Sequence, residues 1–295
     1  MAKPEFSAVA LDRFLESAFP IRGPLQQLTE GEESRAFAFE EGEEAFVVRV
    51  NATAEGFEMD RLIGAALSDS AIPVPDVVML APLETGSFAC VSRRLPGDTL
   101  QALPKGGAFA FGSAVAQTLD QLAGLDRTIL NRLAASPLMA TQASWPDFVA
   151  TVTRLDWRQA STGAHNSIDR WTDFVAGCVA SLPQRQGLVH GDFGSNNVLV
   201  QHGLVSGVLD WSEARIGDPL YDVANILFWR SWLDCMEQQC RYFEQREPWR
   251  LAEREILTCY QLRIGLETLH EAFADGDARL TVWAMQRCSA IAEAL

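Results

Sequence analysis

The sequence lacks the features that would mark several common protein classes. No GxxxxGK[ST] or GxGxxG motif occurs, so the P-loop and dinucleotide-binding folds lose their best support. No uninterrupted apolar run is long enough to cross a bilayer, and the N-terminal Met-Ala-Lys-Pro-Glu-Phe carries no apolar signal segment. We therefore expect a cytoplasmic globular protein with no membrane partner.

Basic residues are also scarce. Lysine and arginine number 24 against 39 aspartates and glutamates, which gives a formal net charge of −15. A nucleic-acid partner is not expected, because the phosphate backbone requires a basic surface. An acidic cleft would instead attract a cationic small molecule. The alternative is that the acidity only keeps the protein soluble.

CxxC spacing is absent, although the chain has six cysteines. Most of these cysteines have apolar neighbours in the sequence. A disulfide framework or a zinc site would require closer or more regular spacing. The sequence therefore predicts reduced, buried thiols.

The hydrophobic pattern changes about one third of the way along the chain. The first third alternates like strands around a few helices, and the remainder has helical periodicity. With 295 residues, two lobes are expected: a β-rich lobe over 1–95 and a helical lobe over 96–295, an α+β architecture. The predicted helices are 7–19, 57–69, 109–125, 145–160, 167–182 and 254–274; the predicted strands are 36–39, 45–50, 77–80 and 87–92.

The segment from His190 to Trp211 contains most of the chemically informative residues. Two apolar runs, 198–200 and 204–209, flank a short polar turn and predict a β-hairpin. The hairpin would bring Asn197 and Asp210 together, with Asp192 close by.

These three residues match the equipment of a kinase site. A carboxylate at Asp192 can orient a hydroxyl group and take its proton, while Asn197 and Asp210 offer the oxygen donors that Mg²⁺ prefers. His190 resembles a metal ligand, but we interpret it as a structural residue bonded to the backbone. Asp218 and Asp222 belong to a helix start, Gly-Asp-Pro-Leu-Tyr-Asp, and are interpreted as structural too.

The β-rich segment supplies candidates for nucleotide binding. Arg49 ends a strand-like run, where a cation can hold phosphate oxygens, and Glu58 or Asp60 on the next helix could pair with it. The polar loop before these strands would cover the phosphates. The adenine ring would contact main chain at the end of the last strand. The remaining candidates are Gly31 and Ser34 in the loop, and Val91, Ser92, Arg93 and Leu95 at the strand end.

The motif His190-Gly-Asp192, Asn197, Leu-Asp210-Trp and Gly-Asp-Pro-Leu-Tyr-Asp222 resembles the aminoglycoside phosphotransferase family. Within that family the chain is most similar to members that act on hygromycin B. The similarity is less clear over 128–170 and at the C-terminal end. Further similar stretches are 28–37, 48–51, 92–94, 190–199, 210–214, 223–226, 228–230, 232–233, 235–239, 241–244 and 262–266.

The resemblance implies a two-lobed protein-kinase-like fold and transfer of the ATP γ-phosphate to an antibiotic, a resistance activity. The implied acceptor is the 4-hydroxyl of hygromycin B, with GTP in place of ATP left open and a monomer as the implied state. Asp192 is implied as the base, Asn197 and Asp210 as Mg²⁺ ligands, Arg49 as the phosphate cation and Asp60 as its helix partner.

An acceptor of this kind needs an acidic pocket with flat surfaces for sugar rings. The best candidates are Trp229, Trp232, Asp234, Glu237 and Glu213. The alternative for the tryptophans is helix packing, and for the acids a solvated helix face. Two other functions stay open: a kinase of the same fold with another acceptor (another aminoglycoside, a macrolide or a choline-like metabolite), and a non-catalytic pseudokinase.

Overall fold

The computed structural model describes residues 7–20, 22–28, 35–83, 86–160 and 162–294. The chain divides into two compact units, the first formed by Met1–Gly97 with Ser206–Glu213, and the second by Asp98–Val205 with Ala214–Leu295. The expected division at 95/96 differs in two respects: the boundary lies after Gly97, and the eight residues Ser206–Glu213 return to the first unit. Among the described residues, no helix combines the length and apolar character needed to span a membrane.

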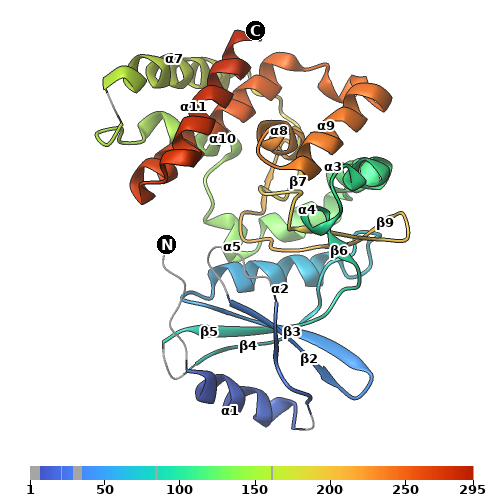
Figure 1. The fold of residues 1–295 in the computed structure, drawn as a ribbon. Coiled ribbons are helices and arrows are strands. Elements are labelled where there is room, and N and C mark those ends of the chain that lie inside the picture. Colours follow the sequence, from blue (N-terminus) through green and yellow to red (C-terminus); the bar gives the residue numbers. More distant parts are fainter. Residues whose placement is uncertain (1–6, 21, 29–34, 84–85, 161, 295) are drawn as a thin grey trace. The chain divides into compact units, whose positions relative to one another are not determined.

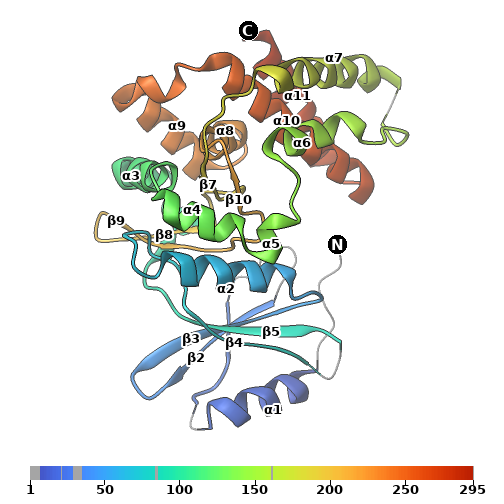
Figure 2. The same cartoon turned by 180° about the vertical axis from the view of Figure 1, so that it is seen from behind.

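The first unit is built on an antiparallel sheet with strand order β1-β2-β3-β5-β4. Helices α1 and α2 lie on opposite faces of this sheet (Figures 1 and 2). A tight turn joins β2 to β3, because Gly42, with φ +63°, adopts the left-handed conformation that such a turn requires. The elements are α1 (Ala8–Ala18), β1 (Gln26–Gln27), β2 (Arg35–Glu41), β3 (Glu44–Asn51), α2 (Glu55–Leu67), β4 (Val77–Pro82) and β5 (Phe88–Arg93).

The core of the first unit lies between α1 and one face of the sheet. Phe19, Phe39 and Phe46 form a triangle with ring centroids 5.0–5.4 Å apart. Leu11 and Leu15 of α1 pack into the same cluster, as the helical spacing predicts. Side chains alternate between the two faces of a strand, so every second residue of β3 and β5 points away from this core. Arg49 and Ser92 are polar residues on that other face.

The second unit is mainly helical. Helices α7, α10 and α11 lie side by side, and α8 is packed against α10 (Figures 1 and 2). Its helices are α3 (Gly112–Ala123), α4 (Arg127–Ala134), α5 (Pro137–Ala140), α6 (Trp145–Ala150), α7 (Thr162–Cys178), α8 (Leu220–Trp229), α9 (Asp234–Arg246), α10 (Arg254–Asp275) and α11 (Ala278–Glu293). Short 3₁₀ turns are η1 (Leu100–Ala102), η2 (Gly107–Phe111), η3 (Thr151–Arg154), η4 (Val179–Ser181) and η5 (Pro248–Leu251).

Two small sheets complete the second unit. Strand β7 (Gly187–Val189) pairs with β10 (Arg215–Gly217), and β8 (Val198–Gln201) lies between β6 (Asp98–Thr99) and β9 (Leu204–Val208). The predicted hairpin is confirmed: β8 and β9 are joined by His202 and Gly203, whose φ values of +51 and +80 suit a two-residue hairpin turn. The boundary between the units falls within β9.

The predicted helix over 145–160 is wrong in its length. Helix α6 ends at Ala150, and only η3 follows it. The hydroxyls of Thr151 and Thr153 donate to backbone carbonyls three residues earlier, and the Asp156 carboxylate accepts the N–H of Arg158. Such local side-chain bonds compete with helix continuation, which explains why the apolar pattern alone misled the prediction.

Candidate active site

The first unit holds a charged cluster on the polar face of its sheet. Arg49 of β3 pairs with Cys90 of β5 across the sheet, so both point to the face that α2 covers. The guanidinium of Arg49 forms an ion pair with Asp60 of α2, and it lies over the ring of Phe57 with 5.0 Å to the centroid. Of the two acids that the sequence offered as partners, the structure places Asp60 against Arg49.

Asp60 also fixes the segment that contains Asp210. Its Oδ1 atom accepts the backbone N–H of Trp211 at 2.8 Å. The indole of Trp211 is 1% exposed and donates to the carbonyl of Val208 at 3.1 Å. Asp210 itself is exposed and adopts φ +58, a left-handed conformation that is uncommon outside glycine.

The neighbouring carboxylates and burial shift the pKa values of Arg49 and Cys90. Burial disfavours the charged form of Arg49, but the carboxylates of Asp60 and Asp210 outweigh it and raise the pKa of the guanidinium above its ordinary value. Burial also raises the pKa of the Cys90 thiol to about 11. Arg49 is therefore a fixed cation beside two carboxylates, and Cys90 is a neutral neighbour.

The other nucleotide-binding candidates of the first unit do not all lie on the sheet face that carries Arg49. Val91 is fully buried in the core cluster next to α1, on the sheet face opposite to Arg49. Its side chain therefore does not contribute an apolar wall on the Arg49 face, where Cys90 and Ser92 lie instead. Arg93 is paired with Glu44 and with Asp76, and Leu95 is half-buried. Gly31 and Ser34 lie outside the described residues.

The second unit holds Asp192 on a loop that follows β7. Gly191 and Gly194 have φ values of +93 and +122, which the sharp loop requires. Gly194 also permits close packing, because a Cβ there would lie 2.5 Å from Met236 Cε. Asp192 is exposed at the surface of this unit.

Asp222 of α8 holds the start of this loop. Its carboxylate accepts the backbone N–H groups of His190 and Gly191 at 2.8 and 2.9 Å. Burial raises the pKa of Asp222 to about 7, and the negative charge of Asp192 also raises it. The hydrogen bonds from the two N–H groups lower the pKa, but burial outweighs them. His190 is completely buried, and its Nδ1 accepts the N–H of Asp192 at 3.3 Å.

Two amide side chains hold Asp192 directly. Asn197 Nδ2 donates to Asp192 Oδ2 at 2.9 Å and to its backbone carbonyl at 3.0 Å. Asn225 of α8 donates to the Phe193 carbonyl at 3.2 Å and lies 3.5 Å from Asp192 Oδ1. Asn225 was not among the residues predicted from the sequence. Its spacing of three residues from Asp222, which puts both on one helix face, was the available signal.

Asp218 braces the start of α8. It accepts both Nε and Nη2 of Arg185, at 3.0 and 2.8 Å, and the hydroxyl of Tyr260 at 3.0 Å. It also accepts the N–H of Leu220 at 3.1 Å, the contact expected of a helix cap. These contacts occupy the carboxylate in a structural network.

A cavity of about 240 Å³ lies in the second unit beside the N-terminus of α9. Its wall includes Gln101, whose Oε1 accepts the hydroxyl of Ser195 at 2.5 Å, so the cavity adjoins the Asp192 loop. Asp234 also lines it, and its Oδ2 accepts the N–H of Gly106 at 2.8 Å. The other lining residues are Leu100, Leu103, Pro104, Lys105, Ala108, Leu233 and Cys235.

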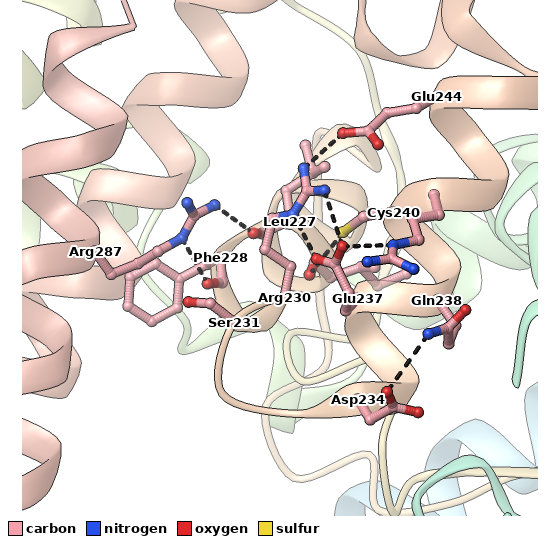
Figure 3. A network of polar contacts seen from close by, with 12 residues as sticks. Leu227, Phe228, Arg230, Ser231, Asp234, Glu237, Gln238, Cys240, Glu244 and Arg287 are labelled. Atoms are coloured by element: carbon pink, nitrogen blue, oxygen red, sulfur yellow. Dashed lines mark hydrogen bonds and ion pairs between the residues drawn. The ribbon is translucent and has the colours of Figure 1, made fainter. Parts of the chain in front are cut away.

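The remaining acceptor candidates are not equivalent. Glu237 is engaged by two arginines: its carboxylate lies 2.9 Å from Arg230 Nε (Figure 3). The same carboxylate lies 2.8 Å from Arg241 Nε, so its charge is already balanced. Trp229 and Trp232 are half-buried at the end of α8 and in the turn that follows. Glu213 is exposed and belongs to the first unit, whereas the other candidates belong to the second.

Comparison with known proteins agrees with this geometry. The sequence model of the phosphotransferase enzyme family matches residues 24–255. Hygromycin-B 4-O-kinase from Escherichia coli is 39% identical over 301 residues, which cover 99% of this chain and 87% of that protein.

Solved structures are similar over nearly the whole chain. The crystal structure of aminoglycoside phosphotransferase APH(4)-Ia matches with a TM-score of 0.85 and 36% identity, covering 97% of this chain and 98% of that one. A thermostable mutant of that enzyme, in a ternary complex with AMP-PNP and hygromycin B, matches with a TM-score of 0.86 and 38% identity, covering 96% and 98%. The expected kinase-like fold is therefore confirmed.

Proposed function

The chain belongs to the phosphotransferase enzyme family, and from that premise we propose that it transfers the γ-phosphoryl group of ATP to the 4-hydroxyl of hygromycin B. The observation that carries this proposal is the bracing of Asp192. An exposed carboxylate, held by Asn197 and Asn225 on a loop fixed by Asp222, is suited to orient an incoming hydroxyl. The relative at 39% identity that is named for this reaction supports the choice of acceptor.

In the proposed reaction, the acceptor hydroxyl oxygen forms a bond to the γ-phosphorus as the bond to the bridging oxygen breaks. ADP leaves, and the hydroxyl proton passes to the Asp192 carboxylate. Arg49 would neutralise phosphate oxygens, with Asp60 fixing its guanidinium. The backbone at Ser92 and Leu95 would face the nucleotide base.

Magnesium fits the donors that we assign to it. Asn197 uses its amide nitrogen on Asp192, which leaves the amide oxygen as a ligand, and Asp210 offers an exposed carboxylate. When bound, the ion would neutralise charge on the phosphates. We further place the enzyme in the cytoplasm as a monomer, with Glu213, Trp229, Trp232 and Asp234 facing the acceptor.

A growth test combined with a purified assay decides between acceptors. Sensitive bacteria that express the chain should grow on hygromycin B and stay sensitive to other aminoglycosides. Purified protein should phosphorylate hygromycin B with ATP, and a parallel assay with GTP should define the donor. Protection against a different drug would point to another acceptor, and ATP binding without phosphorylation of any acceptor in the panel would support a pseudokinase.

A further inference from the structure

Three tryptophans meet where α8, the turn after it and α11 come together. Trp229 ends α8, Trp232 lies in the turn before α9, and Trp283 belongs to α11. The rings of Trp229 and Trp283 are stacked, with centroids 5.2 Å apart and planes 10° from parallel. Trp283 also contacts Trp232, with centroids 5.1 Å apart. One side chain of α11 thus packs against both tryptophans that we place in the acceptor site.

Hydrogen bonds also connect α11 to the end of α8 and to the turn after it. Trp283 Nε1 donates to the hydroxyl of Ser231 at 3.0 Å. Arg287, one helical turn later, donates to the carbonyls of Leu227 and Phe228 at 2.6 and 2.9 Å, which lie at the C-terminal end of α8 (Figure 3). A guanidinium is favourable there, because the last carbonyls of a helix are unpaired and carry partial negative charge.

Arg279, one helical turn before Trp283, covers Trp232 from the same helix. Its guanidinium carbon lies 4.6 Å from the centroid of the indole, within the range of a cation–π contact. Arg279 therefore covers one face of this indole, and Trp283 of the same helix contacts the same ring. The angle of the Trp232 ring is therefore set from α11.

The same turn leads directly into the cavity beside α9. The N–H groups of Trp232 and Leu233 both donate to the carbonyl of Trp229, at 3.0 and 3.1 Å, so the turn is a single hydrogen-bonded piece. Leu233 and Asp234 are the next residues, and both line the cavity of about 240 Å³. A shift of the turn would consequently move an acidic wall of the cavity as well as the indoles.

Resting on the function proposed above, we infer that Trp283 is a positioning residue for the acceptor. It acts through Trp229, Trp232 and the turn between them, and it has no part in nucleotide binding or proton transfer. Stacking of a saturated ring on an indole requires a near-parallel approach, and small misplacements of a bound substrate are costly. Loss of Trp283 should therefore weaken acceptor binding selectively.

The test measures kcat and both KM values, with ATP and hygromycin B varied in turn. Trp283→Ala should raise the KM for hygromycin B about tenfold and leave kcat and the KM for ATP within about twofold, as loss of binding contacts does. Trp283→Phe keeps a smaller aromatic ring but lacks the N–H donor to Ser231, so its rise should be smaller than that of Trp283→Ala. Val282→Ala, at a 58% exposed neighbour on α11, is the matched control and should behave as wild type.

A double mutant tests the route of the effect. If Trp283 acts through Trp229 and Trp232, then Trp229→Ala with Trp232→Ala should show nearly the same KM for hygromycin B whether Trp283 is wild type or replaced by Ala. An unchanged KM in Trp283→Ala would overturn the inference, as would additive effects or equal damage to kcat and the KM for ATP. The wild-type assay distinguishes failure of the proposed function from failure of the Trp283 inference. An inactive wild type refutes the proposed function, whereas an active wild type with an unaffected Trp283→Ala refutes only the inference about Trp283.

Discussion

The carboxylate of Asp60 accepts the backbone N–H of Trp211 at 2.8 Å, across 151 positions of sequence. Its other oxygen is paired with Arg49. A single helix residue therefore fixes both the cation that we assign to phosphate binding and the residue that follows the metal-ligand candidate Asp210.

Substitution of Asp60 should separate these two contacts. Asp60→Asn retains an oxygen for the Trp211 N–H but removes the charge beside Arg49, so the KM for ATP should rise about tenfold, as expected when a charged contact is lost. Asp60→Ala also leaves the Trp211 N–H unpaired, and its free energy of unfolding should be lower than that of Asp60→Asn by about 1–3 kcal/mol. Steady-state kinetics and urea unfolding measure the two effects. Glu58→Gln is the control, and an equal rise in that variant would refute the pairing.

Asn225 should matter for the chemical step. Its amide lies against Asp192 Oδ1 and holds the Phe193 carbonyl, so Asn225→Ala should lower kcat about tenfold while both KM values stay near wild type, as for a residue that orients the base. Asn225→Asp puts a second carboxylate beside Asp192 and should lower kcat further. Wild-type kcat in both variants would show that Asn197 alone positions the base.

Much of the fold follows from local sequence signals, and the exceptions have physical causes. The strands β2 to β5, helix α1 and the β8–β9 hairpin combine clear periodicity with turn residues, and each was predictable. Helix α6 ended early because threonine hydroxyls bond locally, which hydrophobic periodicity does not register. The return of Ser206–Glu213 to the first unit depends on contacts such as that between Val208 N–H and the Pro73 carbonyl, which are distant in sequence.

In the candidate site, too, some residues were predictable from local sequence and others depend on tertiary contacts. Asp192, Asn197 and Asp210 belong to one short motif whose spacing indicates their chemistry. Residues that contact the candidate residues from other elements, such as Asn225 and Trp283, have no motif of their own and emerge only from tertiary contacts. A sequence also does not reveal which charges are already used, which is why Glu237 resembled a free acidic wall although two arginines engage it.

The buried carboxylate of Asp222 should make stability depend on pH. Its folded pKa of about 7 lies above the ordinary value of 3.8, so between these limits the folded state keeps a proton that the unfolded state releases. The contribution of Asp222 to the free energy of unfolding should therefore fall as pH rises from about 4 to about 7, by at most about 1.4 kcal/mol per pH unit. Above about pH 7 this contribution should stay constant.

Urea unfolding over this pH range, with Asp222→Asn beside wild type, measures that contribution. Asparagine does not titrate, so the difference between the two proteins should lose its pH dependence only above about pH 7. A constant difference between pH 4 and pH 7 would mean that Asp222 is already ionised at the acidic end.

Arg263 should matter for folding more than for catalysis. It is 1% exposed, lies 3.6 Å from the Phe148 ring centroid and donates to the Tyr221 hydroxyl at 2.7 Å. Arg263→Ala leaves these partners unpaired and should lower the free energy of unfolding by about 3 kcal/mol or more. Glu267→Gln, at the 46% exposed end of the Arg263 ion pair, should cost less than about 1 kcal/mol. Equal losses would show that the exposed ion pair carries the stability.

The most direct test of the proposed function is the initial rate of ATP-dependent hygromycin B phosphorylation by Asp192→Ala relative to wild type. We expect a fall of at least about 10²-fold, with AMP-PNP binding by calorimetry unchanged, because the variant lacks only the group that orients the hydroxyl and takes its proton. A wild-type rate in Asp192→Ala would contradict the proposed function.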